Sequence, residues 1–239
     1  MLTPRLKKIA EQAVPGLVCA DIGTDHGYLP VFLVQKGIIP AAVASDLRSG
    51  PLERAAQSVR SAGLTDRIRT VLAPGLEGLI PGEAGQCVIA GMGGQMIIGI
   101  LGNSPETAGQ MKRLILQPQN NERELRIWLS ENGYRIIREL TAIEDKRFYS
   151  IIVAEPGKTR KLTAFEQKTG CREARAAEPE YQSYLKMLIE KNVRILESSR
   201  GGNSEAAADR ARETELYLEE LKEELETITT EEMRECKKQ

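Results

Sequence analysis

The residues best suited to chemistry form a glycine-rich loop, Asp21-Ile-Gly-Thr-Asp-His-Gly27, which joins an apolar run to a helical segment that begins at Tyr28. Glycines let the backbone approach a ligand and helix amides point at it, so the loop predicts a nucleotide-sized pocket. A dinucleotide fingerprint requires G-x-G-x-x-G, whose glycines admit a pyrophosphate. Here Asp25 stands in that turn and would repel the pyrophosphate of NAD or FAD. Its charge favours S-adenosylmethionine, which carries a sulfonium and an ammonium.

A second carboxylate follows the next apolar run. Asp46 lies about 20 residues beyond the loop, where an acidic side chain typically accepts both hydroxyls of a ribose. The same residue could cap the helix that follows at Gly50 and Pro51. The order and interval of the loop and Asp46 favour an adenosine ligand.

Two later turns fall at the same edge of the predicted sheet. The segment Ala90-Gly-Met-Gly-Gly94 has three glycines in four positions, which indicates close approach of a planar group, although a tight turn that needs positive φ is the plainer interpretation. Gln117-Pro-Gln-Asn120 offers amide donors and acceptors, and it could equally cap the next helix. His26 is the only histidine. With no G-x-S-x-G motif, a hydrogen-bonding role for it competes with direct participation.

Short apolar runs alternate with amphipathic segments, which predicts a doubly wound α/β sheet. The clearest helix covers Asn120 to Ser130 and closes at Asn132-Gly133. Only residues 144–147 separate the last two runs, so these predict an antiparallel hairpin at one edge of the sheet. We expect strands at residues 17–22, 41–46, 67–73, 86–91, 113–118, 134–143 and 148–155.

Composition limits the classes of protein that remain. The 239 residues include 33 basic and 34 acidic side chains, a net charge of −1, so any contact with nucleic acid needs a local basic patch. The four cysteines are too far apart for a disulfide framework or a zinc cluster, which predicts reduced thiols, a cytoplasmic protein and no metal. We find neither a signal peptide nor an apolar run long enough to cross a membrane, and therefore expect a soluble protein without membrane contact.

The composition changes at Pro156-Gly157. The stretch to Arg175 has six basic and two acidic residues, a net charge of +4. Two long amphipathic helices follow, at residues 180–198 and 204 to about 229, and their short Gly-rich connection predicts an antiparallel helical hairpin. We therefore expect a cofactor domain at residues 1–157, followed by a basic linker and helical hairpin at residues 158–239.

Five segments together resemble the bacterial tRNA (adenine-22-N1)-methyltransferase family: ADIGTDHGYLP, VASDLRSGP, VIAGMGG, LILQPQNNERELRIWL and FYSIIVAE. The resemblance covers the whole first domain and becomes faint after Lys161. It implies a class I, Rossmann-like methyltransferase sheet with a C-terminal coiled-coil-like domain that contacts tRNA. The implied reaction is methyl transfer from S-adenosylmethionine to N1 of adenine 22.

The resemblance also assigns residues to roles. For catalysis we expect Asp25 to stabilise the cationic product, Tyr149 to stack on the base or pack its strand, and Gln117 to supply an amide. The predicted cofactor set is Asp21, Gly23, Thr24, His26, Gly27, Asp46, Leu47, Gly75, Leu76, Ala90, Gly91, Met92 and Gly93. The predicted tRNA contacts are Arg5, Asn120, Lys158, Arg160 and Lys161, and a monomer is favoured.

Four positions depart from the family pattern. Asp46 stands where relatives often have Glu, and Pro74 removes a side-chain contact to the adenine amine; Gln119 and Ser150 also differ. Two alternatives stay open at this point. One is a small-molecule methyltransferase whose helical tail forms a lid or dimer contact, and the other is a non-catalytic RNA-binding protein with a degenerate cofactor pocket.

Overall fold

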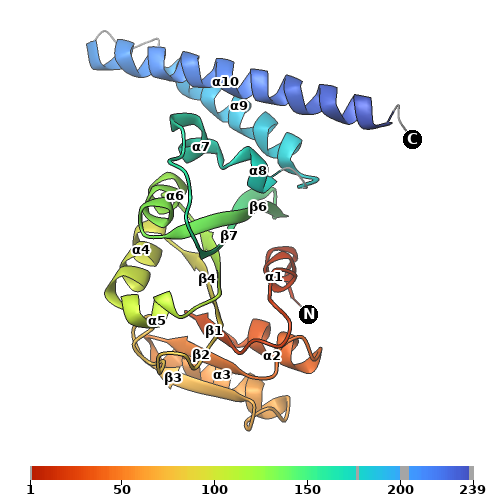
Figure 1. Ribbon diagram of the computed structural model, residues 1–239, viewed down its shortest axis with the longest axis vertical. Coiled ribbons are helices and arrows are strands. Elements are labelled where there is room, and N and C mark those ends of the chain that lie inside the picture. The colour runs from red at the N-terminus through yellow and green to blue at the C-terminus, as the bar shows by residue number, and fades with distance from the viewer. Residues whose placement is uncertain (1, 176–177, 200–204, 237–239) are drawn as a thin grey trace. The chain divides into compact units, whose positions relative to one another are not determined.

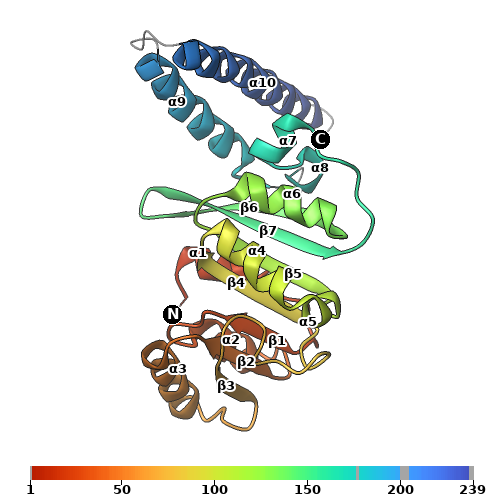
Figure 2. The same cartoon turned by 90° about the vertical axis from the view of Figure 1, so that its left-hand side faces the viewer.

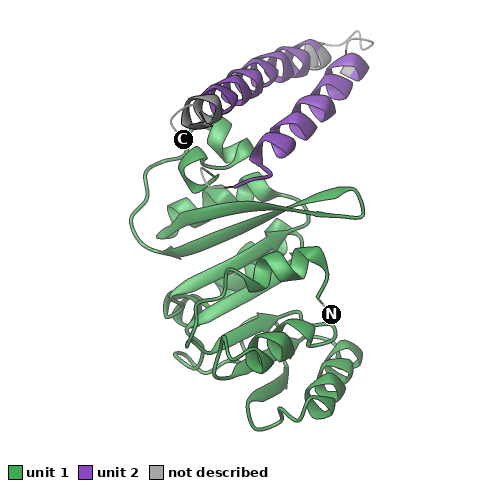
Figure 3. Cartoon of the chain, turned by 90° about the vertical axis from the view of Figure 1, so that its right-hand side faces the viewer, with its two compact units in different colours: residues 1–176 green, residues 177–239 purple. Residues whose placement is uncertain are grey.

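The computed structural model describes residues 2–175, 178–199 and 205–236. The chain forms two compact units, residues 1–176 and residues 177–239, which Figure 3 distinguishes by colour. The first unit holds the sheet and its helices, and the second consists of two long helices.

A seven-stranded sheet organises the first unit (Figure 1). Its strands lie in the order β3-β2-β1-β4-β5-β7-β6, with β1 to β5 parallel and β7 antiparallel to both β5 and β6. The Rossmann-like sheet and its edge hairpin confirm the predicted fold class. The strands are β1 (Cys19–Ile22), β2 (Ala42–Asp46), β3 (Ile68–Leu72), β4 (Gln86–Met92), β5 (Arg113–Pro118), β6 (Tyr134–Glu144) and β7 (Arg147–Pro156).

Helices cover both faces of the sheet, as Figure 2 shows in a second view. Successive strand residues point to opposite faces, so Cys87 and Ile89 pack in one core cluster and Val88 in the other. Both faces being covered explains why these strands are nearly continuous apolar runs. One face carries α1 (Pro4–Ala10), α2 (Tyr28–Gln35) and α3 (Ser49–Ser61); the other carries α4 (Gly94–Asn103), α5 (Pro105–Gly109) and α6 (Glu122–Glu131).

The carboxyl ends of β1, β2 and β4 share one edge of the sheet because these strands are parallel neighbours. The strand order reverses between β1 and β4, which is where open α/β sheets bind ligands. Two glycines shape the turns at this point: Gly23, after β1, has a φ of +76°, and Gly91, at a bulge in β4, has a φ of +79°. Positive φ values favour glycine. The fold therefore brings the predicted loops together at one edge.

Residues 158–175 belong to the first unit, and not with the helical hairpin as the change in composition suggested. They form α7 (Ala164–Thr169) and α8 (Arg172–Arg175). A fully buried ion cluster ties them to the sheet: Arg126 Nη2 donates to Glu139 Oε2 at 2.9 Å, and Arg175 Nη2 donates to the same oxygen at 3.2 Å. A composition break marks where the sheet ends, but it does not reveal this buried attachment.

The second unit pairs α9 (Tyr181–Ser199) with α10 (Glu205–Cys236). Leu185 of α9 and Leu221 of α10 are fully buried, and Tyr181 Oη donates to Glu224 Oε1 at 3.3 Å. This bond joins the start of α9 to the later part of α10, so the helices are antiparallel, as expected. Leu216 of α10 lies outside this packing and is 63% exposed. The predicted Gly-rich connection at residues 200–204 lies outside the described residues.

Candidate active site

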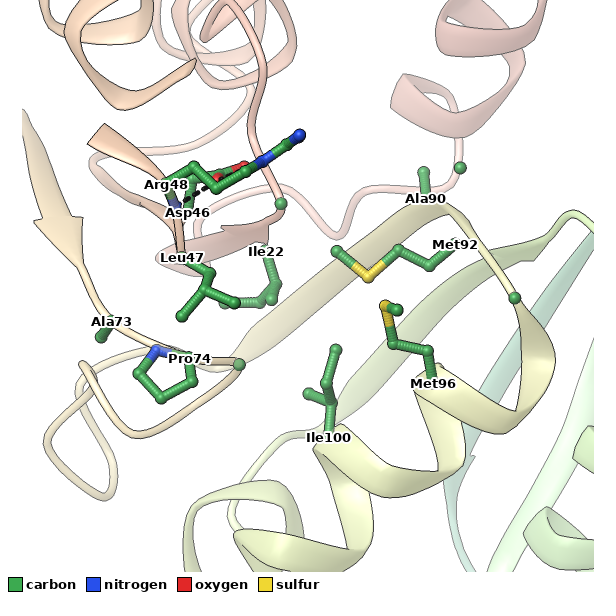
Figure 4. Close-up of a pocket in the computed structure, with 14 residues that line it drawn as sticks. Ile22, Asp46, Leu47, Arg48, Ala73, Pro74, Ala90, Met92, Met96 and Ile100 are labelled. Carbon is green, nitrogen blue, oxygen red and sulfur yellow. Dashed lines mark hydrogen bonds and ion pairs between the residues drawn. The ribbon is translucent and has the colours of Figure 1, made fainter. Parts of the chain in front are cut away.

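A cavity of about 620 Å³ opens at the carboxyl edge of the sheet (Figure 4). The side chains of Met92, Met96 and Ile100 point into it opposite Leu47 and Pro74. Its walls are therefore mainly apolar and suit a flat, weakly polar ring. The full lining is Ile22, Gly23, Asp46, Leu47, Arg48, Ala73, Pro74, Gly75, Ala90, Gly91, Met92, Gly93, Met96 and Ile100.

Glycines make room for this cavity, which we call the large cavity. A Cβ on Gly23 would collide with the methyl group of Met92. The Met92 side chain therefore occupies the space that a side chain at position 23 would need. Gly75, on the loop after β3, has a φ of +53°, and a Cβ there would lie 3.0 Å from Ile100 Cγ2. Substituting either glycine would strain the backbone and crowd the wall.

Asp46 supplies the carboxylate of the large cavity. Its side chain is 8% exposed at the end of β2, and its Oδ1 accepts a hydrogen bond from the Arg48 backbone N–H at 2.7 Å. The Arg48 guanidinium Nε lies 3.8 Å from the same oxygen. The residue thus holds a fixed carboxylate at the cavity wall, where the sequence predicted a ribose partner.

A smaller cavity of about 210 Å³, the small cavity, adjoins the large one, since Gly23 and Ala90 line both. It lies between the glycine-rich loop, α1 and the start of α2. Its composition is more polar, with acidic, basic and aromatic side chains. Besides the two shared residues it is lined by Arg5, Leu6, Asp21, Thr24, Asp25, His26, Gly27, Tyr28 and Leu29.

The two aspartates of the small cavity have opposite electrostatic environments. Burial raises the pKa of Asp21 to about 6, and the neighbouring Asp46 carboxylate adds to this effect. Asp25 is 61% exposed, and a hydrogen bond from Arg54 lowers its pKa. The second oxygen of Asp25 lies 3.4 Å from His26 Nε2. Asp25 is therefore the more firmly ionised group, while Asp21 carries a charge that its surroundings penalise.

Arg5 links α1 to the edge hairpin and to β5. Its Nη1 donates to Gln117 Oε1 at 2.6 Å, and its guanidinium carbon lies 5.3 Å from the centroid of the Tyr149 ring. Its backbone N–H donates to Glu144 Oε2 at 3.2 Å. Gln117 is fully buried, and its amide nitrogen donates to the Pro118 carbonyl at 2.7 Å. Of these residues only Arg5 lines the small cavity; Gln117 and Tyr149, expected to be catalytic, contact Arg5 and line neither cavity.

The predicted cofactor set divides between the two cavities. Leu47, Asp46, Gly75 and the turn at 90–93 line the large cavity, whereas Asp21, Thr24, His26 and Gly27 line the small one. Leu76 lines neither of them: it is 1% exposed and packs in the core, and it borders a hollow beside α4 that adjoins the large cavity, since Pro74, Gly75, Met96 and Ile100 line both. A leucine after a glycine can line a cavity or pack in the core, so the motif alone did not show which of the two Leu76 does.

The predicted tRNA contacts are likewise divided. Arg5 lines the small cavity, and Asn120 supports the glycine turn, because its carbonyl accepts from the Gly94 N–H at 2.9 Å. Lys158 and Lys161 are exposed, but Arg160 forms a bidentate ion pair with Glu166. Glu166 is already counted in the net charge of +4, and Arg175 is buried beside Glu139, so fewer basic groups are exposed than the stretch contains.

Sequence reasoning missed several lining residues. Met96 and Ile100 stand four residues apart on α4, directly after the glycine turn, and Met96 is 59% exposed. That helical spacing behind a ligand-binding turn could have indicated them. Tyr28, which follows the last glycine of the loop, was likewise given no role.

Within residues 2–175, 178–199 and 205–236, no group of three or more His, Cys, Asp or Glu side chains is placed to hold a metal ion. Cys19, Cys87 and Cys171 are buried free thiols. Among the helices that the structure describes, none has the length and hydropathy to cross a bilayer.

Comparison with known proteins agrees with this geometry. A family model described as a methyltransferase domain matches residues 2–152. The tRNA (adenine(22)-N(1))-methyltransferase of Bacillus subtilis is 38% identical over 156 residues, which cover 65% of this chain and 66% of that protein.

Two solved structures extend the likeness to nearly the whole chain. The Streptococcus pneumoniae protein Sp1610, solved in complex with S-adenosyl-L-methionine, is 33% identical with a TM-score of 0.79, covering 91% of this chain and 100% of that one. Mycoplasma capricolum TrmK, solved with S-adenosyl-homocysteine, is 29% identical with a TM-score of 0.80, covering 95% and 99%. The likeness therefore includes the region after Lys161, where sequence motifs were faint.

Proposed function

The chain belongs to the methyltransferase domain family, within its group of tRNA (adenine-22-N1)-methyltransferases, and we propose that it transfers a methyl group from S-adenosylmethionine to N1 of adenine 22 in tRNA. The observation that carries the proposal is the pair of adjoining cavities at the strand switch point, one apolar with a fixed carboxylate and the other polar and acidic. Such an arrangement can hold a nucleoside cofactor next to a second base. A tRNA substrate implies a cytoplasmic enzyme.

The residues of the large cavity fit S-adenosylmethionine. Asp46 offers a carboxylate for ribose hydroxyls, and the methionine and isoleucine side chains of α4 offer an apolar surface for adenine. Pro74 lines the same wall but has no polar side chain, so a backbone carbonyl would have to accept from the adenine amine in place of the side chain that the family pattern implies. When bound, the cofactor supplies a methyl group on a positively charged sulfur. The volume of the large cavity, about 620 Å³, lies in the range that is usual for cofactor sites.

Asp25, in the small cavity, suits the acceptor side of the reaction, while the buried Asp21 interacts with the Asp46 carboxylate and suits the cationic part of the cofactor. N1 of a neutral adenine already has a lone pair in the ring plane, so the enzyme needs no strong base. Alignment of the two reactants can contribute ~7 to 11 kcal/mol. Methylation leaves a cationic base, and the Asp25 carboxylate, which lines the small cavity, would stabilise that charge as it develops. The adenine must be unpaired or flipped to expose N1, which costs a few kcal/mol.

The direct test is an incubation of the protein with unmodified tRNA and cofactor labelled in its methyl group. After digestion to nucleosides, we expect label in 1-methyladenosine, and tRNA with guanine at position 22 should stay unlabelled. Cofactor binding without transfer to tRNA would contradict the proposal and favour a binding protein. Label in a small-molecule acceptor alone would favour the other alternative.

We further propose that Lys158 and Lys161 contact tRNA phosphates, because both are exposed after β7 while Arg160 is paired with Glu166. Replacing both lysines with glutamate should weaken tRNA binding and reduce its salt dependence by about two phosphate contacts, a slope change of ~1.8. The measurement is tRNA affinity across a series of salt concentrations. Arg160→Ala is the matched control and should change the slope less. An unchanged slope in the double variant would contradict this assignment.

A further inference from the structure

An aromatic ring at the rim of the small cavity has no evident role in folding. Tyr28, the first residue of α2, is 53% exposed, whereas Leu29, Leu33 and Val34 of the same helix are buried. The helix thus fills the core without this ring. Tyr28 also lines the small cavity, so its exposure falls next to the acceptor side of the site.

The loop holds this ring in a fixed orientation. The ring of His26 lies parallel to that of Tyr28, with centroids 5.0 Å apart and an interplanar angle of 9°. Gly27 between them has a φ of +66°, and a Cβ there would lie 3.3 Å from the Cα of Ala55 on α3. The turn that stacks the two rings therefore depends on glycine. His26 covers one face of Tyr28, so the exposed surface lies on the opposite face and edges.

The surroundings of Tyr28 suit a base that acquires positive charge. The small cavity that it lines shares Gly23 and Ala90 with the large cavity, which places the ring beside the cofactor site. Asp21 and Asp25 line the same space and contribute negative charge. An aromatic face binds any nucleobase, and it binds a cationic one more strongly.

The other aromatic candidate is less accessible. Tyr149 is half-buried and packs against the core cluster under α1, and the Arg5 guanidinium lies over its ring at 5.3 Å. Stacking on Tyr149 would require Arg5 to leave both this ring and Gln117. Tyr28 requires no such rearrangement.

We propose that Tyr28 stacks on the adenine that receives the methyl group, with His26 supporting the ring from behind. This inference rests on the proposed function, because the acceptor is taken to be a nucleobase of tRNA. It adds a substrate-binding residue that the glycine-rich motif did not reveal.

The first test compares Tyr28→Ala with Tyr28→Phe. A lost stacking contact of ~1 to 3 kcal/mol should lower kcat/KM for tRNA between about 5-fold and 150-fold in the alanine variant. The phenylalanine variant should retain activity, and cofactor affinity measured by calorimetry without tRNA should be unchanged in both. Ile80→Ala, which removes a side chain 70% exposed and outside both cavities, is the matched control. Thermal unfolding checks that each variant is folded.

The second test asks whether Tyr28 contacts the nucleotide at position 22 of the tRNA. In the wild-type protein, an abasic residue at position 22 should weaken tRNA binding, and in Tyr28→Ala the same lesion should cost no further affinity. Additive losses would overturn the proposal, as would coupling to an abasic residue at a neighbouring position. Equal losses of cofactor and tRNA affinity in Tyr28→Ala would instead assign the ring to the cofactor site. Wild-type methylation is the reference throughout, so an inactive wild type refutes the proposed function, and an active Tyr28→Ala variant refutes only the stacking.

Discussion

The two cavities share a wall but differ in character. The large cavity is lined by thioether and aliphatic side chains around one fixed carboxylate, whereas the small cavity collects two aspartates, an arginine and two stacked rings. Apolar walls contribute affinity in proportion to the area that they cover. Charged groups act where charge changes during a reaction. The difference predicts that cofactor binding depends mainly on the large cavity and turnover mainly on the small one, and the two cavities meet at Gly23 and Ala90.

The strongest test of this separation is Asp25→Ala. Loss of its carboxylate should reduce kcat about 100-fold, a typical cost of removing one group that stabilises transition-state charge. Cofactor affinity should stay close to normal, because Asp25 is exposed and paired with Arg54, whereas the buried Asp21 is the aspartate that interacts with the Asp46 carboxylate of the large cavity. Single-turnover methylation and calorimetry measure the two quantities.

The control for this variant is Arg54→Ala, which keeps the carboxylate but removes its ion-pair partner. We expect this variant to retain most of its turnover. A loss of kcat as large as that of Asp25→Ala would show that turnover depends on the ion pair with Arg54 and not on the Asp25 charge alone.

The converse change is Asp46→Ala, in the large cavity. It should weaken cofactor binding about 10- to 100-fold, the usual cost of a lost charged hydrogen bond. Turnover at saturating cofactor should recover, because the acceptor side is untouched. Asp66→Ala, an exposed aspartate on the loop before β3, serves as the control. A fall in kcat that excess cofactor does not restore would show that the cavities act as one.

The next effect, intermediate in size, is a pH dependence of cofactor binding that arises from Asp21. Its pKa is raised to about 6, so it gains a proton as the pH falls through that value. A cationic ligand favours the ionised form, and its binding should therefore weaken on acidification, by up to about tenfold between pH 7 and pH 5. Calorimetric titrations with cofactor across this range measure the effect.

Asp21→Asn should bind the cofactor with little dependence on pH. Because Asp25 and His26 line the same cavity, the series is repeated with His26→Gln, which should keep the wild-type profile. A flat profile in the wild-type protein would contradict the assignment to Asp21.

The smallest effect is expected from Met96→Ala. The side chain is 59% exposed at the mouth of the large cavity, and a bound ligand would cover only part of it. At ~0.8 kcal/mol for each methylene fully buried, we expect a threefold to tenfold loss of cofactor affinity with kcat unchanged. Equilibrium dialysis measures this loss. Leu72→Ala, also exposed but outside both cavities, should bind cofactor normally.

The sheet was predictable because its physical causes are local in the sequence. Strands covered on both faces must be apolar throughout, so runs such as 113–118 were visible without any tertiary information. The four residues between the last two runs fixed their antiparallel pairing. The attachment of α7 and α8 was not predictable, since Arg126, Glu139 and Arg175 are distant in sequence and look like ordinary surface charges.

The candidate site was predictable where backbone geometry demands a particular residue. Gly23 and Gly91 could be identified because their backbones have positive φ at strand ends, and Asp46 because it follows the glycine-rich loop at the interval of a ribose-binding carboxylate. The places of Leu76 and Tyr28 could not be predicted from the sequence. A leucine and a tyrosine suit core, cavity or surface equally well, and only the packing of the whole domain decides which one they occupy.

The buried ion cluster has a consequence for truncated forms of the protein. Ending the chain at Gly157, where the composition changes, would remove Arg175 and the carbonyl groups of 167 and 168 that Arg126 Nη1 contacts. Breaking a buried ion pair typically costs ~3 to 5 kcal/mol, which is a large part of the stability of an ordinary domain. Such a fragment would lose activity by unfolding, and the loss would be mistaken for the absence of an RNA-binding tail. A cut after Ala176 removes the helical hairpin and leaves the cluster whole.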